Sequence, residues 1–291
     1  MRKLLERPLA AAALAILALM VVLSLAAPLI EIALGLDATE TDLLKRYQPP
    51  SSEHILGTDE IGRDVFLRLL HGGRVSLLVG FVAAVMAAAI GTAIGIVAGY
   101  FGGKFDAALM RLTDGVIALP LLPLLIVLAA IDLSKLGLTD LAQSESASLY
   151  RIIAITALVG WTTVARLVRG TTLSLKSRDF VRAAIAMGAR PLRVMAVHIL
   201  PNAISPVIVA TTLAVGQIIL FESALSFLGL GIQPPIPSWG NMLTNAQEVI
   251  WTAPFLAVYP GLLILFTVAS CNLLGDTLQE ILDPRSGKPK R

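Results

Sequence analysis

Charged residues are scarce in this chain of 291 residues. Asp, Glu, Lys and Arg make up 15% of the sequence and hydrophobic residues 56%, with a mean hydropathy of +0.80. Soluble globular domains average roughly 25% charged residues, so the composition excludes a single soluble core, and it equally excludes a disordered or collagen-like chain. The net charge of +3 does not indicate a nucleic-acid partner, because the basic residues lie in clusters between apolar runs. The sequence predicts an all-α protein that crosses the membrane several times.

Residues that could form a disulfide, bind a metal or catalyse a reaction are also few. The single cysteine, Cys271, excludes an internal disulfide and a cysteine-based zinc site. The three histidines, His54, His71 and His198, lie far apart and lack the spacing of metal ligands. The chain contains no G-x-x-x-x-G-K-[ST] phosphate-binding loop and no G-x-S-x-G nucleophile motif. We therefore expect no catalytic residue, no metal site and no cofactor in this chain.

Six runs with few or no charges are candidates for transmembrane helices. A spanning helix needs about 20 apolar residues, and five runs meet or approach this length. The fourth run reaches it if Arg151 and Arg166 extend their side chains to opposite interfaces. The predicted spans are residues 8–30, 75–103, 115–131, 149–168, 194–221 and 249–275.

The distribution of basic residues predicts the orientation. If the N-terminus lies in the cytoplasm, 16 of the 23 Lys and Arg residues fall in inner segments and 7 in outer ones. Both termini are then cytoplasmic. The first apolar run follows Arg2, Lys3 and Arg7 and could also be a signal peptide. Its apolar core exceeds the roughly 7–15 residues of a signal sequence, which favours an uncleaved helix.

Three segments between the spans are long enough to form structure. Residues 31–74 are predicted to be an outer loop that ends in an amphipathic helix over residues 59–71. Residues 234–248 form a second outer loop, rich in proline and tryptophan, and residues 166–193 form the inner loop.

Two glycine and proline patterns bear on helix packing. Gly91, Gly95 and Gly99 form a stripe of small residues that allows close helix approach, either within the chain or across a dimer. Pro120 and Pro123 are expected to bend or loosen the third span.

The inner loop has the signals of two short helices joined by a defined bend. Ser177 is predicted to cap the first helix, and Asp179 lies in its first turn. Gly188 suits the position just after that helix, and Pro191 suits the first turn of the next. The mixture of small residues and arginines favours a protein partner over a membrane-surface helix bound to anionic lipid.

These residues resemble a known signature. The pattern R-A-A-x-x-x-G, followed nine residues later by H-I-L-P (residues 182–201), looks like the "EAA" signature of binding-protein-dependent ABC importer permeases. The resemblance implies that this loop contains a coupling helix, which docks in a cleft of an ATPase subunit. Arg182 stands where that signature has glutamate, so the acidic contact is not carried over. The expected coupling residues are Phe180, Arg182, Ala183, Ala184, Ile185, Met187, Gly188, Ala189 and Arg190.

Three further stretches extend the resemblance over nearly the whole chain. Residues 56–80, 222–243 and 272–285 look like the "C" permease of the dipeptide/oligopeptide/nickel branch. The implied fold is that of a type I (MetI-like) permease with six transmembrane helices. The implied organisation is an N-terminal helix and outer loop (1–74), a core of five spans (75–285) with a coupling loop (169–201), and a cytoplasmic tail (286–291).

The resemblance also implies function and partners. The chain would be half of an ATP-driven import pathway in a bacterial inner membrane, working by alternating access. Its partners would be a second permease, two ATPase subunits that bind ATP and magnesium, an external substrate-binding protein and the lipid bilayer. Peptides are the favoured cargo, with nickel or another small solute as the alternative. An ion-coupled secondary transporter is disfavoured, because the spans contain almost no ionisable residues.

Two sets of candidate site residues follow. Glu222 is expected near the outer end of the fifth span, where it would be partly hydrated. Arg63 and Asp64 are expected to form local ion pairs first and contacts to the binding protein second, and Trp239 suits the membrane interface. The pathway candidates are Gln217, Phe221 and Glu222, and the candidate contacts to the binding protein are Asp59, Arg63, Asp64 and Trp239.

Overall fold

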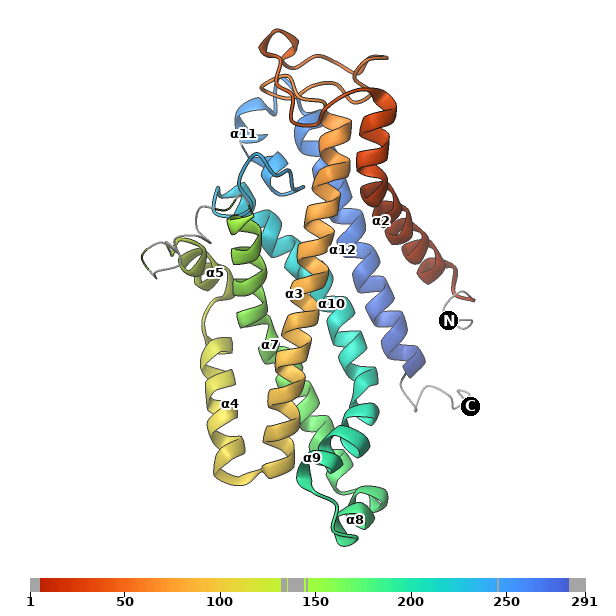
Figure 1. Cartoon of the computed structure of the whole chain (residues 1–291), viewed down its shortest axis with the longest axis vertical. Helices are drawn as coiled ribbons and strands as arrows, with labels where there is room; N and C mark the ends of the chain where they lie inside the picture. The colour runs from red at the N-terminus through yellow and green to blue at the C-terminus, as the bar shows by residue number, and fades with distance from the viewer. Residues whose placement is uncertain (1–5, 132–134, 136–143, 145, 245, 283–291) are drawn as a thin grey trace.

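The computed structural model of the chain describes residues 6–131, 135, 144, 146–244 and 246–282. Within these ranges the regular secondary structure is helical, which confirms the predicted all-α class. Five long helices form a bundle along the long axis of the molecule (Figure 1). They are α2 (Pro8–Leu34), α3 (Val65–Phe101), α7 (Ala147–Lys176), α10 (Leu200–Phe227) and α12 (Phe255–Leu282). All five are long and apolar enough to cross a membrane, and the span that contains α10 begins at Pro191.

Shorter elements connect the long helices and mark the two ends of the bundle. Residues 35–64 and 228–244 gather toward one end, which we name the loop end; the opposite end carries α8 and is named the α8 end (Figure 1). The shorter elements are η1 (Leu43–Lys45), α4 (Gly103–Ala118), α5 (Leu121–Ala129), α8 (Asp179–Ala186), α9 (Pro191–Arg193), the π-helical η3 (Val194–Ile199), η4 (Asn241–Leu243) and α11 (Ala246–Val249).

The third predicted span, residues 115–131, is not one straight helix. It is divided between α4 and α5, which meet at an angle of 89°. Leu119 at the break has an extended backbone, with ψ of 138°. The cause is Pro120, whose ring disfavours the helical conformation of the preceding residue and whose nitrogen donates no hydrogen bond. The described residues therefore contain five continuous candidate spans and one bent helix pair that is long and apolar enough to form a sixth.

The prediction of a separate amphipathic helix over residues 59–71 is wrong. Helix α3 begins at Val65, and the side chain of Asp64 caps it by accepting a hydrogen bond from the backbone N–H of Leu67 at 2.8 Å. Residues 59–64 form a tight loop in which Gly62 has φ of +84°. A Cβ atom at Gly62 would lie 1.8 Å from the carbonyl oxygen of Asp42. Of the apolar positions of the predicted helix, Val65, Leu69 and Leu70 belong to the first turns of the 37-residue helix α3, while Ile61 lies in the loop before it.

The glycine stripe of α3 packs within the chain. Cβ atoms built at Gly91 and Gly95 would lie 2.5 Å and 2.6 Å from backbone carbonyl oxygens of α7, and one at Gly99 would lie 2.7 Å from Thr172. Only glycine allows the two backbones to approach this closely. The stripe thus holds α3 against α7, which decides between the two predicted uses of the stripe.

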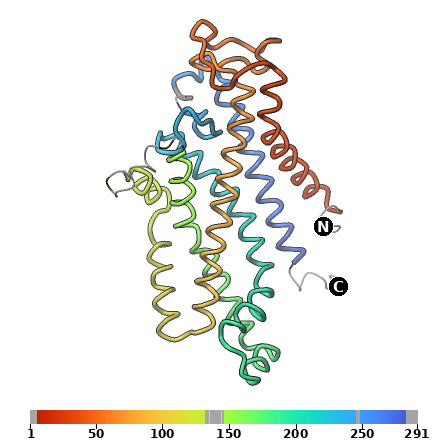
Figure 2. Tube along the Cα trace, in the orientation of Figure 1, coloured from red at the N-terminus to blue at the C-terminus, as the bar shows by residue number. Residues whose placement is uncertain are grey.

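Helices α2 and α12 pack against each other along the side of the bundle (Figure 2). Near the start of α2, Arg7 forms an ion pair with Glu280 of α12. Further along, the hydroxyl of Thr267 donates to the sulfur of Met20 at 3.0 Å. Helix α2 therefore begins and α12 ends on the same side of the bundle.

Candidate translocation cavity and docking helix

A cavity of about 800 Å³ lies between the broken helix pair α4–α5 and the helices α7 and α10. The break at Pro120 contributes to its wall, since residues on both sides of the break line the cavity. Most of the lining is aliphatic. The polar lining residues are Thr156, Thr162, Thr163, Ser205, Gln217 and Gln279.

The cavity wall carries no fixed charge among the described residues that line it. A passage must bind its cargo weakly enough to release it, and an unpaired charge in a low-dielectric wall would hold an oppositely charged cargo strongly. A transporter coupled to an ion gradient, by contrast, places ionisable groups near the middle of the membrane. The described lining therefore offers a cargo hydroxyl and amide groups and aliphatic surface.

The three predicted pathway residues separate into two environments. Gln217 and Phe221 line the cavity, one helical turn apart on α10. Glu222 does not line it, and its side chain is fully buried between α10, α3 and the loop that follows α10. The expectation that Glu222 is partly hydrated is wrong.

Three serine hydroxyls surround the carboxylate of Glu222. Ser226 and Ser238 donate hydrogen bonds to Oε1 at 2.8 Å and 2.9 Å, and Ser76 donates to Oε2 at 3.2 Å. Ser226 lies one turn further along α10, Ser76 lies on α3, and Ser238 lies in the loop. A buried carboxylate needs such partners, because an unsatisfied one would be very costly. Glu222 thus links two spans and the loop.

The same serines hold the loop that follows α10. Each serine oxygen accepts a backbone N–H at 3.0 to 3.1 Å, and the donors are Trp239, Ile232 and Asn241. The indole of Trp239 donates to the carbonyl of Leu69 on α3 at 2.9 Å, and its side chain is 1% exposed. Trp239 is therefore a buried anchor of the loop, not a residue of the membrane interface.

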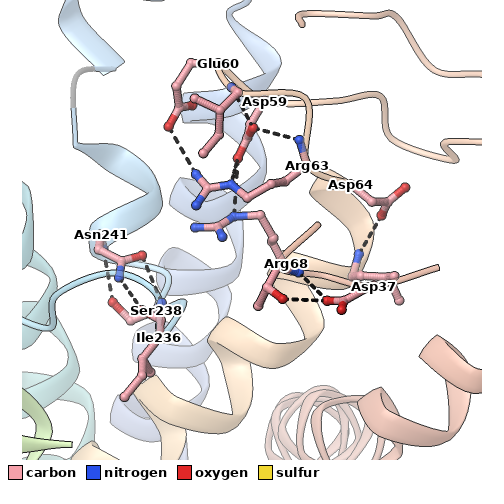
Figure 3. Close-up of polar contacts among 12 residues, drawn as sticks. Asp37, Asp59, Glu60, Arg63, Asp64, Arg68, Ile236, Ser238 and Asn241 are labelled. Atoms are coloured by element: carbon pink, nitrogen blue, oxygen red, sulfur yellow. Dashed lines mark hydrogen bonds and ion pairs between the residues drawn. The ribbon is translucent and has the colours of Figure 1, made fainter. Parts of the chain in front are cut away.

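Acidic and basic side chains meet at the loop end (Figure 3). Asp59 accepts hydrogen bonds from the side chain of Arg63 at 2.7 Å and from the backbone N–H groups of Ile61 and Arg63 at 3.0 Å. Arg68 approaches the same carboxylate, with its Nε 3.4 Å from Oδ2 of Asp59. Asp64 caps α3 and contacts Nδ1 of His54 at 3.0 Å. The predicted local ion pair of Arg63 is present, while Asp59 and Asp64 are buried in internal contacts.

The α8 end carries a helical hairpin, which consists of α8, α9 and the residues beside them (177–193). Helix α7 continues to Lys176, and a helical segment resumes at Pro191, so the non-spanning part of the predicted loop is shorter than residues 169–201. Ser177 does not cap α8, because its hydroxyl donates to the carbonyl of Ser174 at 2.8 Å and Arg178 occupies the cap position. Pro191 opens α9 as predicted.

Gly188 ends α8 in the left-handed conformation, with φ of +81°. Its N–H donates to the carbonyl of Ile185 at 2.9 Å, and the N–H of Ala189 donates to that of Ala184 at 3.1 Å. This pair of bonds closes the helix and fixes the direction of the following chain. The predicted bend therefore has a defined geometry.

Helix α8 exposes most of the residues predicted for coupling. Val181 and Ala184 are buried against the rest of the hairpin, and Ala189 is half-buried. Phe180 is 46% exposed and Met187 81% exposed. The other exposed members of the predicted set are Arg182, Ala183, Ile185, Gly188 and Arg190. The hairpin end thus presents hydrophobic and basic side chains together, a composition typical of protein interfaces.

Comparison with known proteins identifies the architecture. The model of the family described as "Binding-protein-dependent transport system inner membrane component" matches residues 91–288. The chain belongs to this family. It is 38% identical to the dipeptide transport system permease protein DppC of Alkalihalophilus pseudofirmus over 98% of this chain and 88% of the relative. It is 35% identical to the oligopeptide transport system permease protein OppC of Bacillus subtilis (96% and 87%), and 42% identical to the glutathione transport system permease protein GsiD of Shigella flexneri (81% and 74%).

Membership of this family establishes the general role of the chain. It is the membrane subunit of an ABC importer and not itself an enzyme, and it implies ATPase and substrate-binding partners. The described residues form an all-helical bundle with five or six candidate membrane spans, and the fold is that of a MetI-like permease. The protein is a multi-pass protein of the inner membrane.

The sequence places Ser226 one helical turn after Glu222, but it did not indicate Ser76, Ser238 or the position of Arg68. Ser76 and Glu222 are separated by 146 residues, so no local pattern connects them. Arg68 did carry a signal, because it is a charged residue among the apolar positions of the predicted amphipathic helix. The predicted tail, residues 286–291, and the last residues of the predicted core lie outside the described residues.

Proposed function

We propose that this permease forms half of the import pathway for di- and oligopeptides. A second, homologous permease supplies the other half, two ATPase subunits bind ATP and magnesium at the α8 end, and an external substrate-binding protein docks at the loop end. The observation that carries the proposal is the exposed α8 hairpin, with Phe180 and Met187 projecting beyond the spans and Gly188 fixing the bend.

The orientation of the chain in the membrane is part of this proposal. The α8 end lies in the cytoplasm, in accordance with the concentration of Lys and Arg in the segments around α8. Both chain ends are then cytoplasmic. The adjacency of Arg7 and Glu280 supports this arrangement, since α2 begins and α12 ends on one side of the bundle.

Transport follows from coupling the hairpin to the broken span. Closure of the ATPase subunits on ATP draws the two α8 hairpins together, and α7 and α10 transmit the movement because they continue directly from the hairpin. The cavity between α4–α5, α7 and α10 then opens alternately to the two sides. A break at Pro120 allows α4 and α5 to move separately.

Peptides suit this cavity better than a metal ion. A volume of about 800 Å³ falls within the roughly 300–1,000 Å³ of small-molecule sites. Threonine, serine and glutamine side chains can exchange hydrogen bonds with a peptide backbone. Nickel would need imidazole, thiolate or carboxylate ligands, and the described lining of this half of the pathway offers none. The names of the peptide and glutathione relatives support the same cargo class.

A substitution at Gly188 tests the docking role. Valine at a φ of +81° is strained by about 1–3 kcal/mol, so Gly188→Val should distort the hairpin while leaving the spans intact. We expect the variant to insert and to retain its permease partner, but to lose the ATPase subunits on co-purification and to lose transport. Ser174→Val, at an exposed position of α7 outside the hairpin, is the control. Normal co-purification and transport by Gly188→Val would contradict the proposal.

A further inference from the structure

A second, smaller pocket lies at the loop end, apart from the membrane cavity. Its volume is about 250 Å³, and it lies between the start of α3, the loop after α10 and the start of α12. Gln233, Pro234 and Thr244 are exposed and form its rim, while buried Arg68 lines its inner wall. We name this space the Arg68 pocket. It connects the surface of the loop end with a cluster of paired charges, in which Arg68 and Arg63 line the pocket together with Asp59 and Glu60.

Arg68 lacks a full set of partners. The residue is 5% exposed, and its Nη1 atom is buried without a hydrogen-bond partner. Its charged contact is the 3.4 Å approach of Nε to Asp59. Arg63 holds that carboxylate more closely, at 2.7 Å, and also holds Glu60 at 3.2 Å. A buried donor without an acceptor is costly, so Arg68 is prepared for an acceptor that comes from outside the chain.

The geometry of the pocket selects the kind of acceptor. Figure 3 shows the guanidinium groups of Arg63 and Arg68 next to each other, on the side that faces Asn241. The side chain of Asn241 is fully engaged, because its amide donates to the carbonyls of Ile232 and Ile236 and its oxygen accepts the N–H of Ser238. It therefore does not supply the missing acceptor. A guanidinium group binds carboxylates in preference to neutral groups, often through two parallel hydrogen bonds.

The size of the pocket indicates that the carboxylate belongs to a protein side chain and not to a free small molecule. A volume of about 250 Å³ is below the range of small-molecule sites, but it is ample for one acidic side chain. The segments that line the pocket also lie at the loop end, opposite α8 (Figure 1). We propose that the Arg68 pocket receives the carboxylate of an aspartate or glutamate side chain presented by the substrate-binding protein when it docks. This inference rests on the proposed function, which places that protein at the loop end.

The test measures how much loaded binding protein is needed to stimulate ATP hydrolysis by the assembled transporter in lipid nanodiscs. Loss of one charge-assisted hydrogen bond should raise the half-saturating concentration roughly 10- to 100-fold in Arg68→Gln. Saturating binding protein should restore the stimulated rate. Arg46→Gln is the matched control, because Arg46 is exposed at the same end and does not line the Arg68 pocket.

A second pair of variants keeps Arg68 in place, in case its replacement disturbs folding. Met242 is half-buried and lines the pocket. Met242→Glu supplies a carboxylate from within the chain and should raise the half-saturating concentration in the same way. Met242→Gln has the same shape without the charge and should have little effect.

Three outcomes would overturn the inference. The first is an unchanged half-saturating concentration in both Arg68→Gln and Met242→Glu. The second is an equal effect of Met242→Glu and Met242→Gln. The third is a fall of the maximal stimulated rate of ATP hydrolysis in Arg68→Gln at an unchanged half-saturating concentration, which would assign the carboxylate to the cargo. If the unaltered chain forms no complex that the binding protein stimulates, the proposed function itself fails, and that result is distinguishable from all three.

Discussion

The contact between α3 and α7 leads to a quantitative prediction for Gly95→Ala. The new Cβ would lie 2.6 Å from the carbonyl oxygen of Ala165, 2.8 Å from Cβ of Val168 and 3.0 Å from the backbone nitrogen of Arg169. Carbon atoms pack best at about 3.5–4.0 Å, so the helices must separate by roughly 1 Å. Overpacking of this kind costs about 1–3 kcal/mol, and the better helix propensity of alanine returns at most about 1 kcal/mol. The net loss therefore falls between about 0 and 3 kcal/mol, and the three contacts at or below 3.0 Å favour the middle of this range, about 1–2 kcal/mol.

The native cysteine provides the assay. Cys271 is the single cysteine of the chain and is 4% exposed, so a thiol-reactive fluorescent dye reports its exposure when the bundle unfolds. In a thermal ramp in nanodiscs, the midpoint of Gly95→Ala should fall by roughly 2–8 °C. Gly170→Ala is the control, since Gly170 lies on α7 with nothing within 4 Å of the new Cβ. Equal midpoints for the two variants would refute the close-packing argument.

Two further predictions concern topology and the loop after α10. The topology test uses a background in which the native cysteine is replaced by serine. Ser52→Cys should react with an impermeant thiol reagent from outside the cell, and Ser177→Cys should react only after permeabilisation, because the two positions are exposed at opposite ends of the bundle. Labelling of Ser177→Cys from outside would reverse the proposed orientation. Glu222→Ala removes the carboxylate that accepts hydrogen bonds from three serine hydroxyls. Hydrogen exchange of the backbone amides of residues 229–243 should therefore accelerate at least tenfold. The control Glu248→Ala, at an exposed position, should leave the exchange rate unchanged. Unchanged exchange in Glu222→Ala would show that the carboxylate does not hold the loop.

Charge-free runs were sufficient to predict most of the bundle. Each of the six runs falls on helices, because a lipid-facing backbone must satisfy its own hydrogen bonds. The hairpin was predictable for a similar reason. Gly188 and Pro191 each have one strong local preference, and the structure uses both where the sequence indicated.

The break between α4 and α5 shows the limit of counting apolar residues. Residues 115–131 are uncharged whether the chain is straight or bent by 89°. Pro120 marked the position, but proline also occurs in continuous membrane helices, as Pro28 does in α2 and Pro206 in α10. Pro120 bends the chain in a place where α5 also packs against α7 and α10, and these contacts between distant segments cannot be read from the local sequence.

Glu222 shows why single residues resist prediction from local sequence. Its position near the end of α10 suggested contact with water. Two of the three serines that replace water come from α3 and from the loop after α10, so the environment of Glu222 is complete only once these two parts have packed against α10. The same holds for Arg68, whose pocket combines the start of α3 with the chain on either side of η4.

The most direct test of the account is uptake of a labelled dipeptide by proteoliposomes. They would contain this chain, its permease partner and the ATPase subunits, with loaded binding protein outside and ATP inside. The account predicts accumulation that requires both ATP and the binding protein, persists when ion gradients are collapsed, and is lost in Gly188→Val. Uptake by this chain without ATPase subunits, or uptake that stops when the ion gradients are collapsed while ATP is still present, would contradict it.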